Sequence, residues 1–439
     1  MKFYNRKSEI KRIKEIQKLS LKNAQFTVVT GRRRIGKTQL LLYATQEQPT
    51  LYLFVSRKAE PLLCEDFKQE IIDKLQIPIA GNVQNFNQIF KFLMQLSAQR
   101  NFNLIIDEFQ EFLNINPSVY SDIQRDWDIL KSKSKLNLIV CGSIYSLMHK
   151  IFEDYNAPLY GRATNFIKVK PFKVSVLKKI LAENNSGYTN EDLLALYAFS
   201  GGVAKYVQLF VDNKALTLKK MLALILKEDS AFITDGKTML TEEFGKDYAI
   251  YFSILSSIAS GENTRSKIEA AVGKEVGGYL TRMENDYGLL SKAIPLFAKS
   301  EIKNVRYVID DNFLIFWFRF IYKYSHIIEI NQFAELRKIV ERDYATFSGK
   351  ILEKYFREKF IEQGKITQIG GYWDRKGENE IDLITLNHTN KTMQIMEIKR
   401  NEKHIRYNIL KEKAANMLTN SGQLSGYNIQ YKGLSMANM

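Results

Sequence analysis

The segment from Gly31 to Thr38 constrains the fold of this chain more than any other feature. It reads Gly-Arg-Arg-Arg-Ile-Gly-Lys-Thr, which fits the pattern G-x-x-x-x-G-K-[ST]. An apolar β-type run (26–30) precedes it directly, and a Leu-rich helical pattern (39–44) follows it directly. A phosphate-binding loop needs this strand–loop–helix context, whereas a chance glycine-rich turn does not. The segment therefore predicts binding of a nucleoside triphosphate.

The positions of this loop have distinct roles in that interpretation. Glycines allow the tight turn that points backbone N–H groups at phosphate oxygens, and the following helix adds its positive end. We expect Lys37 to reach the β- and γ-phosphates and the Thr38 hydroxyl to bind Mg²⁺. The predicted nucleotide contacts are Gly31, Arg32, Arg33, Arg34, Ile35, Gly36, Lys37, Thr38 and Gln39. Three arginines in a row are unusual in such a loop. The side chains of Arg32, Arg33 and Arg34 could also face a polyanion or a neighbouring domain instead of the nucleotide.

The composition is that of a globular protein with a large positive charge. The 439 residues are 45% apolar, which suits two to four domains that each have a core. A formal net charge of +16 attracts polyanions such as nucleic acid, but solvated lysine-rich helices explain it equally well. Cys64 and Cys141 each lie in an apolar run, so we expect buried core residues and neither a disulfide nor a zinc site. Without a secretion signal or a long apolar run, the sequence predicts a cytoplasmic protein with no membrane partner.

Short β-type runs alternate with helical stretches over the first 170 residues. The expected strands are 26–30, 51–55, 104–107, 136–141 and 166–169. Alternation at this spacing predicts an α/β fold, in which helices cover both faces of a parallel sheet. The phosphate-binding loop then lies at the carboxyl ends of the strands, where such sheets bind nucleotides.

The pattern changes after this sheet, and four domains with one connecting stretch are predicted in all. They are a P-loop ATPase domain (1–170), a helical lid (171–246), a winged helix (247–310), connecting helices (311–348) and a C-terminal α/β domain (349–439). The lid has a helix break at Ser200-Gly201-Gly202. The winged helix is predicted from helices at 249–259, 264–272 and 275–287, followed by wing strands at 296–299 and 305–308. A very aromatic, buried helix is expected at 312–324.

A second acidic motif supplies what an ATPase needs beside the loop. The apolar strand that begins at Asn103 ends in Asp107, which can hold Mg²⁺, and Glu108 can polarise the attacking water as a general base. Ser143, after the next strand, suits either a hydrogen bond to the γ-phosphate or water, or a helix N-cap. Arg162 suits either charge stabilisation on the phosphoryl group or a place on the surface after a turn.

Several of these motifs together resemble a known family. Their order is Phe3…Arg6…Glu9, Gly31-Arg-Arg-Arg-Ile-Gly-Lys-Thr38, Ile106-Asp-Glu-Phe-Gln110, Gly142-Ser143, Leu159-Tyr-Gly-Arg162, Gly201-Gly202 and Phe316-Trp-Phe-Arg-Phe320. This order is similar to that of archaeal-type ATPases of the AAA+/STAND-related group, over nearly the whole chain. The resemblance implies an ASCE-type ATPase with a helical lid, a winged helix and a C-terminal PD-(D/E)xK nuclease-like domain of unknown function. It also supports ATP as the nucleotide and a role for Arg162, whereas Ala204 stands where similar proteins usually carry proline.

Charged residues near the C-terminal end fit the nuclease-like part of that resemblance. Two β-type runs contain Asp382 and the pair Glu397 and Lys399, which point to the same face because strand side chains alternate. In a hairpin these groups form the D…E-x-K arrangement of Mg²⁺-dependent nucleases, and Glu353 on the preceding helix adds a further ligand. The predicted metal ligands are thus Thr38 and Asp107 at one site, and Glu353, Asp382 and Glu397 at the other. Ordinary charges on an amphipathic hairpin are the alternative.

Three functions remain open from the sequence. The first is a Mg²⁺-dependent ATPase whose nucleotide state repositions the winged helix and the nuclease-like domain on DNA, with a second copy of itself or another protein as a further partner. The second is a nucleotide-regulated DNA endonuclease. The third is a DNA-binding regulator without cleavage, which uses Arg265, Lys267, Lys274 and Arg282, although winged helices also serve as packing modules. We favour the first.

Overall fold

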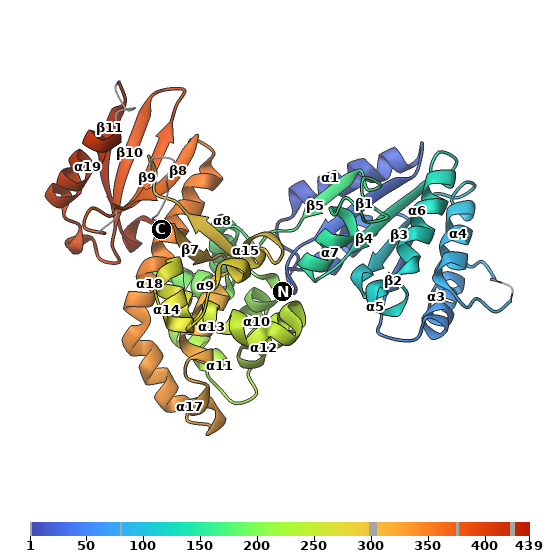
Figure 1. Cartoon of the computed structure of the whole chain (residues 1–439), viewed down its shortest axis with the longest axis horizontal. Helices are drawn as coiled ribbons and strands as arrows, with labels where there is room; N and C mark the ends of the chain where they lie inside the picture. Colours follow the sequence, from blue (N-terminus) through green and yellow to red (C-terminus); the bar gives the residue numbers. More distant parts are fainter. Residues whose placement is uncertain (1, 80, 298–304, 375–376, 422–425) are drawn as a thin grey trace. The chain divides into compact units, whose positions relative to one another are not determined.

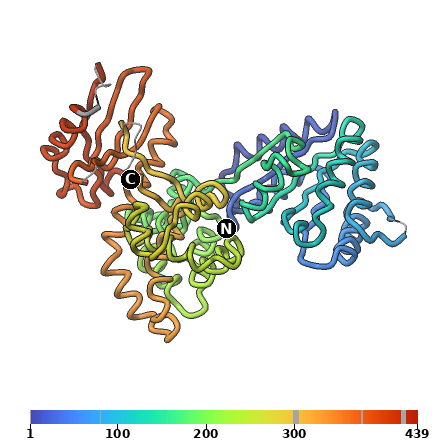
Figure 2. Tube along the Cα trace, in the orientation of Figure 1, coloured from blue at the N-terminus to red at the C-terminus, as the bar shows by residue number. Residues whose placement is uncertain are grey.

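The computed structural model describes residues 2–79, 81–297, 305–374, 377–421 and 426–439. Its contacts divide the chain into two compact units. One unit is Asn5–Lys170, and the other is Met1–Tyr4 with Pro171–Met439. Figure 2 follows the path of the chain, with the first unit in blue to green and the second in green to red.

The unit Asn5–Lys170 is built on a parallel sheet of five strands in the order β2-β3-β4-β1-β5 (Figure 1). The strands are β1 (Gln25–Thr30), β2 (Thr50–Phe54), β3 (Phe102–Asp107), β4 (Leu136–Cys141) and β5 (Asn165–Lys168). All five predicted strands are confirmed. Strand β4 lies between β1 and β3, so a further strand separates the loop strand from the acidic strand, as an ASCE-type sheet requires.

Helices cover both faces of this sheet because the strand side chains alternate. The elements are α1 (Lys7–Ser20), α2 (Lys37–Thr45), α3 (Glu60–Leu75), α4 (Phe86–Leu96), η1 (Phe109–Glu111), α5 (Phe112–Ile115), α6 (Ser118–Leu130) and α7 (Tyr145–Phe152). Phe26 and Val28 lie in one buried cluster with Phe67 of α3, Phe90 of α4 and Trp127 of α6. Helices α1 and α2 contact the sheet through β1, β4 and β3, on the face to which the alternate residues point. The α/β prediction is confirmed.

The second unit begins with five helices. They are α8 (Val174–Asn184), α9 (Asn190–Ser200), α10 (Ala204–Asp212), α11 (Leu218–Ile225) and α12 (Ala231–Phe244). The predicted break at Gly201-Gly202 ends α9, and both glycines have positive φ angles (56° and 74°). Ala204 is the first residue of α10. Proline is favoured at that position without being needed there, so alanine preserves the turn.

A short 3₁₀ helix, three α-helices and a hairpin follow. They are η2 (Gly245–Asp247), α13 (Tyr248–Ala259), α14 (Arg265–Val272), α15 (Gly277–Asn285) and the antiparallel strands β6 (Leu290–Ala293) and β7 (Arg306–Ile309). The prediction of the first wing strand at 296–299 is wrong, because the strand that pairs with β7 lies earlier. Leu296 turns its side chain into the core of the C-terminal sheet instead, and residues 298 and 299 lie outside the described ranges.

The predicted aromatic helix is buried and changes its winding. It begins as α16 (Asn312–Phe316) and continues as a π-helical turn (Trp317–Tyr322), before α17 (Ser325–Glu329). Trp317 packs over Gly236 of α12, where a Cβ atom would lie 2.4 Å from the indole ring. The close approach needs glycine at that position.

A long helix and a mixed sheet complete the second unit. The elements are α18 (Phe333–Gln363), β8 (Gln368–Tyr372), β9 (Ile381–Asn387), β10 (Thr392–Ile398), η4 (Glu402–His404), α19 (Tyr407–Ser421), β11 (Asn428–Leu434) and η5 (Met436–Asn438). The sheet order is β11-β10-β9-β8, in which only β10 and β11 are parallel. Helix α18 runs without a break through residue 349, where a domain boundary is predicted, and that boundary stays a prediction. None of the helices in the described ranges is long and apolar enough to cross a membrane.

Candidate nucleotide-binding site

The predicted phosphate-binding loop joins the end of β1 to the start of α2 (Lys37–Thr45). Gly31 and Gly36 have positive φ angles (152° and 91°), and a Cβ atom on Gly31 would lie 2.6 Å from the carbonyl oxygen of Val169. The Lys37 amine donates hydrogen bonds inside the loop, to the carbonyl oxygens of Gly31 (2.9 Å) and Arg32 (3.3 Å). Burial lowers the pKa of Lys37, and the nearby charges of Asp107 and Glu108 oppose this shift. The loop thus holds a buried cation among backbone groups, which suits a triphosphate.

Asp107 lies at the end of β3 and is held by four donors. The hydroxyls of Thr38 (2.6 Å) and Tyr52 (2.9 Å) donate to Oδ2. The backbone N–H of Glu108 and the thiol of Cys141 donate to Oδ1, each at 2.9 Å. Burial and the charge of Asp107 raise the pKa of the Cys141 thiol, so it stays protonated and can donate. Thr38 and Asp107, the predicted Mg²⁺ ligands of this site, are therefore in direct contact.

Glu108 follows Asp107 in a left-handed backbone conformation (φ 54°). Such a conformation costs about 1–3 kcal/mol for a residue other than glycine and is concentrated at functional sites. Its Oε2 accepts hydrogen bonds from Gln110 Nε2 (2.5 Å) and from Ser143 Oγ (2.8 Å). The N-cap alternative for Ser143 is wrong, because α7 begins later, with Ile144 as its N-cap residue, and Ser143 bonds Glu108 instead.

Three residues of this site were not predicted as functional residues from the sequence. Tyr52 and Cys141 bond Asp107, and Arg6 supports the loop: its guanidinium donates to the carbonyl oxygens of Ile35 (3.1 Å) and Lys170 (2.6 Å). Arg6 is 4% exposed and has a positive φ angle (68°). The position of Arg6 in the family pattern was the one available signal, since nothing in the spacing of Tyr52 or Cys141 marks them.

Arg162 lies away from this group of residues. Its guanidinium contacts Asp128 Oδ2 (3.2 Å) at the end of α6, and it precedes Thr164, whose N–H donates to Phe26 near the start of β1. The loop follows the opposite end of β1, about 15 Å away at ~3.3 Å per strand residue. The structure therefore places Arg162 near the start of β1, away from the phosphate-binding loop, and its role in catalysis stays a prediction.

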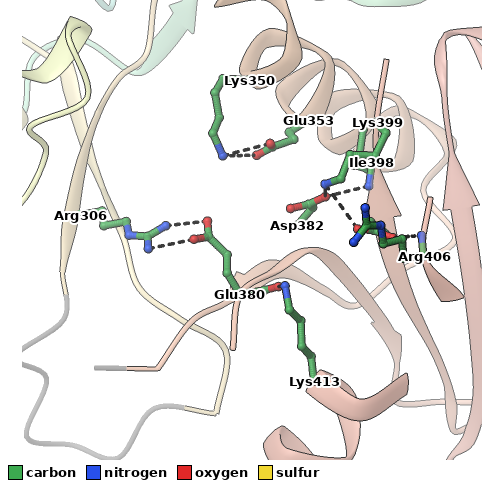
Figure 3. A network of polar contacts seen from close by, with 10 residues as sticks. Arg306, Lys350, Glu353, Glu380, Asp382, Ile398, Lys399, Arg406 and Lys413 are labelled. Atoms are coloured by element: carbon green, nitrogen blue, oxygen red, sulfur yellow. Dashed lines mark hydrogen bonds and ion pairs between the residues drawn. The ribbon is translucent and has the colours of Figure 1, made fainter. Parts of the chain in front are cut away.

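A second cluster of charged groups lies in the C-terminal sheet (Figure 3). Asp382 Oδ2 accepts hydrogen bonds from the Ile398 N–H (2.8 Å) and from the Lys399 amine (3.2 Å). Lys399 also lies 3.5 Å from Glu397 Oε1, two residues earlier in the chain, and the β9–β10 hairpin brings Asp382 beside both. The structure thus brings Asp382, Glu397 and Lys399 together.

Glu353 reaches the same region from α18 and pairs with Lys350 at 3.1 Å. Burial raises the pKa of Glu353 to about 7; Lys350 opposes this shift, and the charge of Asp382 adds to it. Within the ranges that the structure describes, no three His, Cys, Asp or Glu side chains form a group ready to hold a metal ion. Metal binding by Glu353, Asp382 and Glu397 stays a prediction.

Of the basic residues proposed for DNA, Arg265 and Lys267 lie on α14, Arg282 lies on α15, and Lys274 lies between the two helices. Arg265, Gly277, Gly278, Tyr279 and Arg282, together with Glu275, line a pocket of about 570 Å³. Arg265 is paired with Glu269 (2.8 Å). Lys267 is paired with Glu262 (3.0 Å), and Lys274 lies over the ring of Tyr279.

Comparison with known proteins agrees with this geometry. Residues 3–210 match a family described as an ATPase domain predominantly from Archaea. An uncharacterised protein of Methanocaldococcus jannaschii is 30% identical over 405 residues, which covers 90% of this chain and 87% of the relative. The chain belongs to this family of archaeal-type ATPases. Residues 317–416 of this ATPase also match a family described as "Archaea bacterial proteins of unknown function".

Solved structures share the fold of this archaeal-type ATPase. A Walker-type ATPase of Pyrococcus abyssi has a TM-score of 0.55 and 21% identity, and the match covers 72% of this chain and 96% of that chain. The ORC2 protein of Aeropyrum pernix, solved as ADPNP–ADP complexes, has a TM-score of 0.50 and 13% identity, with 75% and 96% covered. At these identities the likeness shows the nucleotide-binding P-loop fold alone.

Proposed function

We propose that this protein hydrolyses ATP with Mg²⁺ and uses the nucleotide state to reposition its second unit on DNA. The contact of Thr38 with Asp107 at 2.6 Å is the observation that carries the proposal. It joins the phosphate-binding loop to the acidic strand across the end of β4, and Glu108 follows directly. Thr38 and Asp107 would hold Mg²⁺, which neutralises phosphate charge when bound.

The protein's own groups divide the remaining work. The amine of Lys37 leaves the carbonyl oxygens of the loop and binds the β- and γ-phosphates. Glu108 accepts a proton from the attacking water, which requires a free carboxylate oxygen. Ser143 and Gln110 fix the orientation of that carboxylate through Oε2, so Oε1 remains for the water.

A pair of substitutions tests this assignment. Lys37→Ala removes ATP binding, and Glu108→Gln keeps binding but lowers the turnover rate by at least about 100-fold, the contribution of a general base. Binding is measured with a fluorescent ATP analogue and turnover by phosphate release. Lys58→Ala is the control, because Lys58 pairs with Asp66 on the surface of the same unit. Tight ATP binding by the Lys37→Ala protein contradicts the assignment.

We propose that Arg162 serves the reaction from a neighbouring copy of the chain, because it lies away from the loop of its own chain. It lies beside the exposed ring pair of Tyr155 and Tyr160, at the edge of the sheet opposite the loop. Mixing Lys37→Ala protein, which retains Arg162, with Arg162→Ala protein, which retains an intact loop, then restores turnover. If the mixture is as inactive as its parts, Arg162 belongs to the surface alone.

DNA binding is proposed for the α14–α15 face. The net charge of +16 and the pocket with two arginines support it. Arg282→Ala is expected to weaken DNA binding and to reduce its salt dependence by about one phosphate contact. DNA affinity that does not fall with added salt contradicts phosphate contacts at this face.

DNA cleavage is a second candidate function, favoured by the contact of Lys399 with Asp382 and Glu397. The test is nicking of plasmid DNA that depends on Mg²⁺. Cleavage that persists in a Glu397→Ala protein assigns the nicking to a contaminant.

A further inference from the structure

The segment around the hairpin β6–β7 is attached to the C-terminal sheet through apolar contacts. The N–H of Leu296 donates to the carbonyl oxygen of Gly371 at 2.8 Å, and its side chain lies in a buried cluster with Ile384 and Leu410. Gly370 leaves the space for it, because a Cβ atom there would lie 2.8 Å from Leu296 Cγ. These contacts hold the segment in place without any charged group.

Arg306 of β7 makes a separate, polar contact with the same domain. Its guanidinium forms a two-pronged pair with the carboxylate of Glu380 (2.8 and 3.2 Å) and lies 4.4 Å from the ring centre of Trp373. The side chains of Arg306 and Glu380 are 25% and 33% exposed, so a ligand from solvent can reach them. A partly exposed ion pair contributes little to stability, because solvent screens the two charges. Fastening the hairpin is therefore a minor consequence of this pair.

The pair lies next to the carboxylate cluster of the sheet. Glu380 precedes Asp382 by two residues, and the charges of both act on Lys350 and Glu353. Figure 3 shows the Arg306–Glu380 pair beside the Lys350–Glu353 pair and Asp382. Lys413 also donates to the Glu380 carbonyl oxygen (3.2 Å). A guanidinium from the three-helix part of the chain thus joins a group of acids and lysines from the C-terminal part.

We propose that Arg306 is a phosphate-binding residue of this C-terminal site, and that its ligand is the phosphodiester backbone of a nucleic acid. The proposal rests on the nucleic-acid partner proposed above. A planar guanidinium fork binds two phosphate oxygens as it binds two carboxylate oxygens, so an incoming phosphate can replace Glu380. The ring of Trp373 holds the Arg306 guanidinium in the same orientation during this exchange. Glu380 acts as the internal competitor that occupies Arg306 until the ligand arrives.

The proposal predicts opposite effects for the two members of one ion pair. Arg306→Ala removes a phosphate contact and lowers nucleic-acid affinity several-fold, with a loss of about 0.7 from the log–log salt slope for a single strand. Glu380→Gln removes the competing charge and raises the affinity several-fold. The double variant behaves as Arg306→Ala, because the competitor no longer matters once the arginine is absent.

The measurement uses the full chain, a short fluorescently labelled single-stranded oligonucleotide, and fluorescence anisotropy in EDTA without nucleotide. EDTA separates this competition from metal binding by the carboxylates. Arg342→Ala and Asp343→Asn are the matched controls, because they change the net charge equally at an exposed pair on α18. Their effects measure the general influence of charge, which the Arg306 and Glu380 variants must exceed.

Each outcome decides a distinct question. Affinity that falls in both Arg306→Ala and Glu380→Gln shows a structural ion pair and overturns the proposal, as do effects no larger than those of the controls. Wild-type protein that binds the oligonucleotide but ignores both substitutions overturns this inference alone. Wild-type protein that binds no nucleic acid overturns the proposed partner as well, whereas ATP hydrolysis is judged separately by Lys37 and Glu108.

Discussion

Tyr52 provides a test of how the acidic strand is prepared for Mg²⁺. Tyr52→Phe removes one of the two hydroxyls that donate to Asp107 Oδ2 and leaves the ring in place. A hydrogen bond to a charged group contributes about 1.5–3 kcal/mol. Because Tyr52 is half-exposed and three donors to Asp107 remain, we expect a loss of about 1 kcal/mol in Mg²⁺-dependent binding, or roughly five-fold.

The assay measures binding of a fluorescent ATP analogue over a range of Mg²⁺ concentrations. The Mg²⁺ concentration at half-maximal binding is expected to rise about five-fold, which corresponds to the loss of about 1 kcal/mol. Nucleotide affinity in EDTA is expected to stay unchanged. Tyr120→Phe is the control, because the Tyr120 hydroxyl is buried in the same unit but donates to the Phe109 carbonyl oxygen. An unchanged midpoint, or an equal shift in the Tyr120→Phe protein, refutes the role of Tyr52 in holding Asp107.

Three further predictions concern packing around the sites. Gly142→Ala places a methyl group 2.5 Å from Met148 Sδ and against Gln110. We expect this overpacking to lower the free energy of unfolding, measured by thermal unfolding, by about 1–3 kcal/mol. Gly187→Ala is the neutral control, because a Cβ atom there lies in open space. Leu296→Ala is expected to lower the free energy of unfolding by about 2–3 kcal/mol in urea; a loss no larger than that of the exposed Ile361→Ala contradicts the apolar attachment of the hairpin. Arg6→Ala leaves the carbonyl oxygens of Ile35 and Lys170 without this donor. We expect the free energy of unfolding to fall by about 2 kcal/mol and nucleotide binding to weaken. An unaltered melting temperature contradicts support of the loop by Arg6.

The sheet of the first unit could be predicted because its strands are short, apolar and separated by helices. Each of its five strands lies where the apolar runs place it. The hairpin β6–β7 was harder, since the runs at 290–293 and 296–299 have similar character. Leu296 belongs to the core of a sheet that follows more than 70 residues later, and local periodicity contains no information on that contact.

The nucleotide site could be predicted at the positions that motifs mark, and only there. Lys37, Thr38, Asp107 and Glu108 lie in patterns whose spacing reflects the phosphate chemistry. Tyr52 and Cys141 meet Asp107 through the register of β2, β3 and β4, which the sequence does not state. For Arg162 the motif could be recognised in the sequence, but its position in the fold could not. Which end of the strands it lies on depends on the direction in which the chain enters β5.

The contacts within the second unit determine what a change of nucleotide state can move. Arg400, directly after Lys399, bonds Glu191 of α9 at 2.5 Å and stacks on Tyr344 of α18. Helix α9 also packs against α8, α10, α11, α16 and α18, and α18 in turn contacts β8 and β9 of the C-terminal sheet. Leu296 and Arg306 attach the three-helix part to the same sheet. Of these contacts the one made by Leu296 is buried, so separating the three-helix part from the C-terminal sheet would expose apolar surface. These contacts predict that the helices after residue 171 and the C-terminal sheet stay together in the motion proposed above.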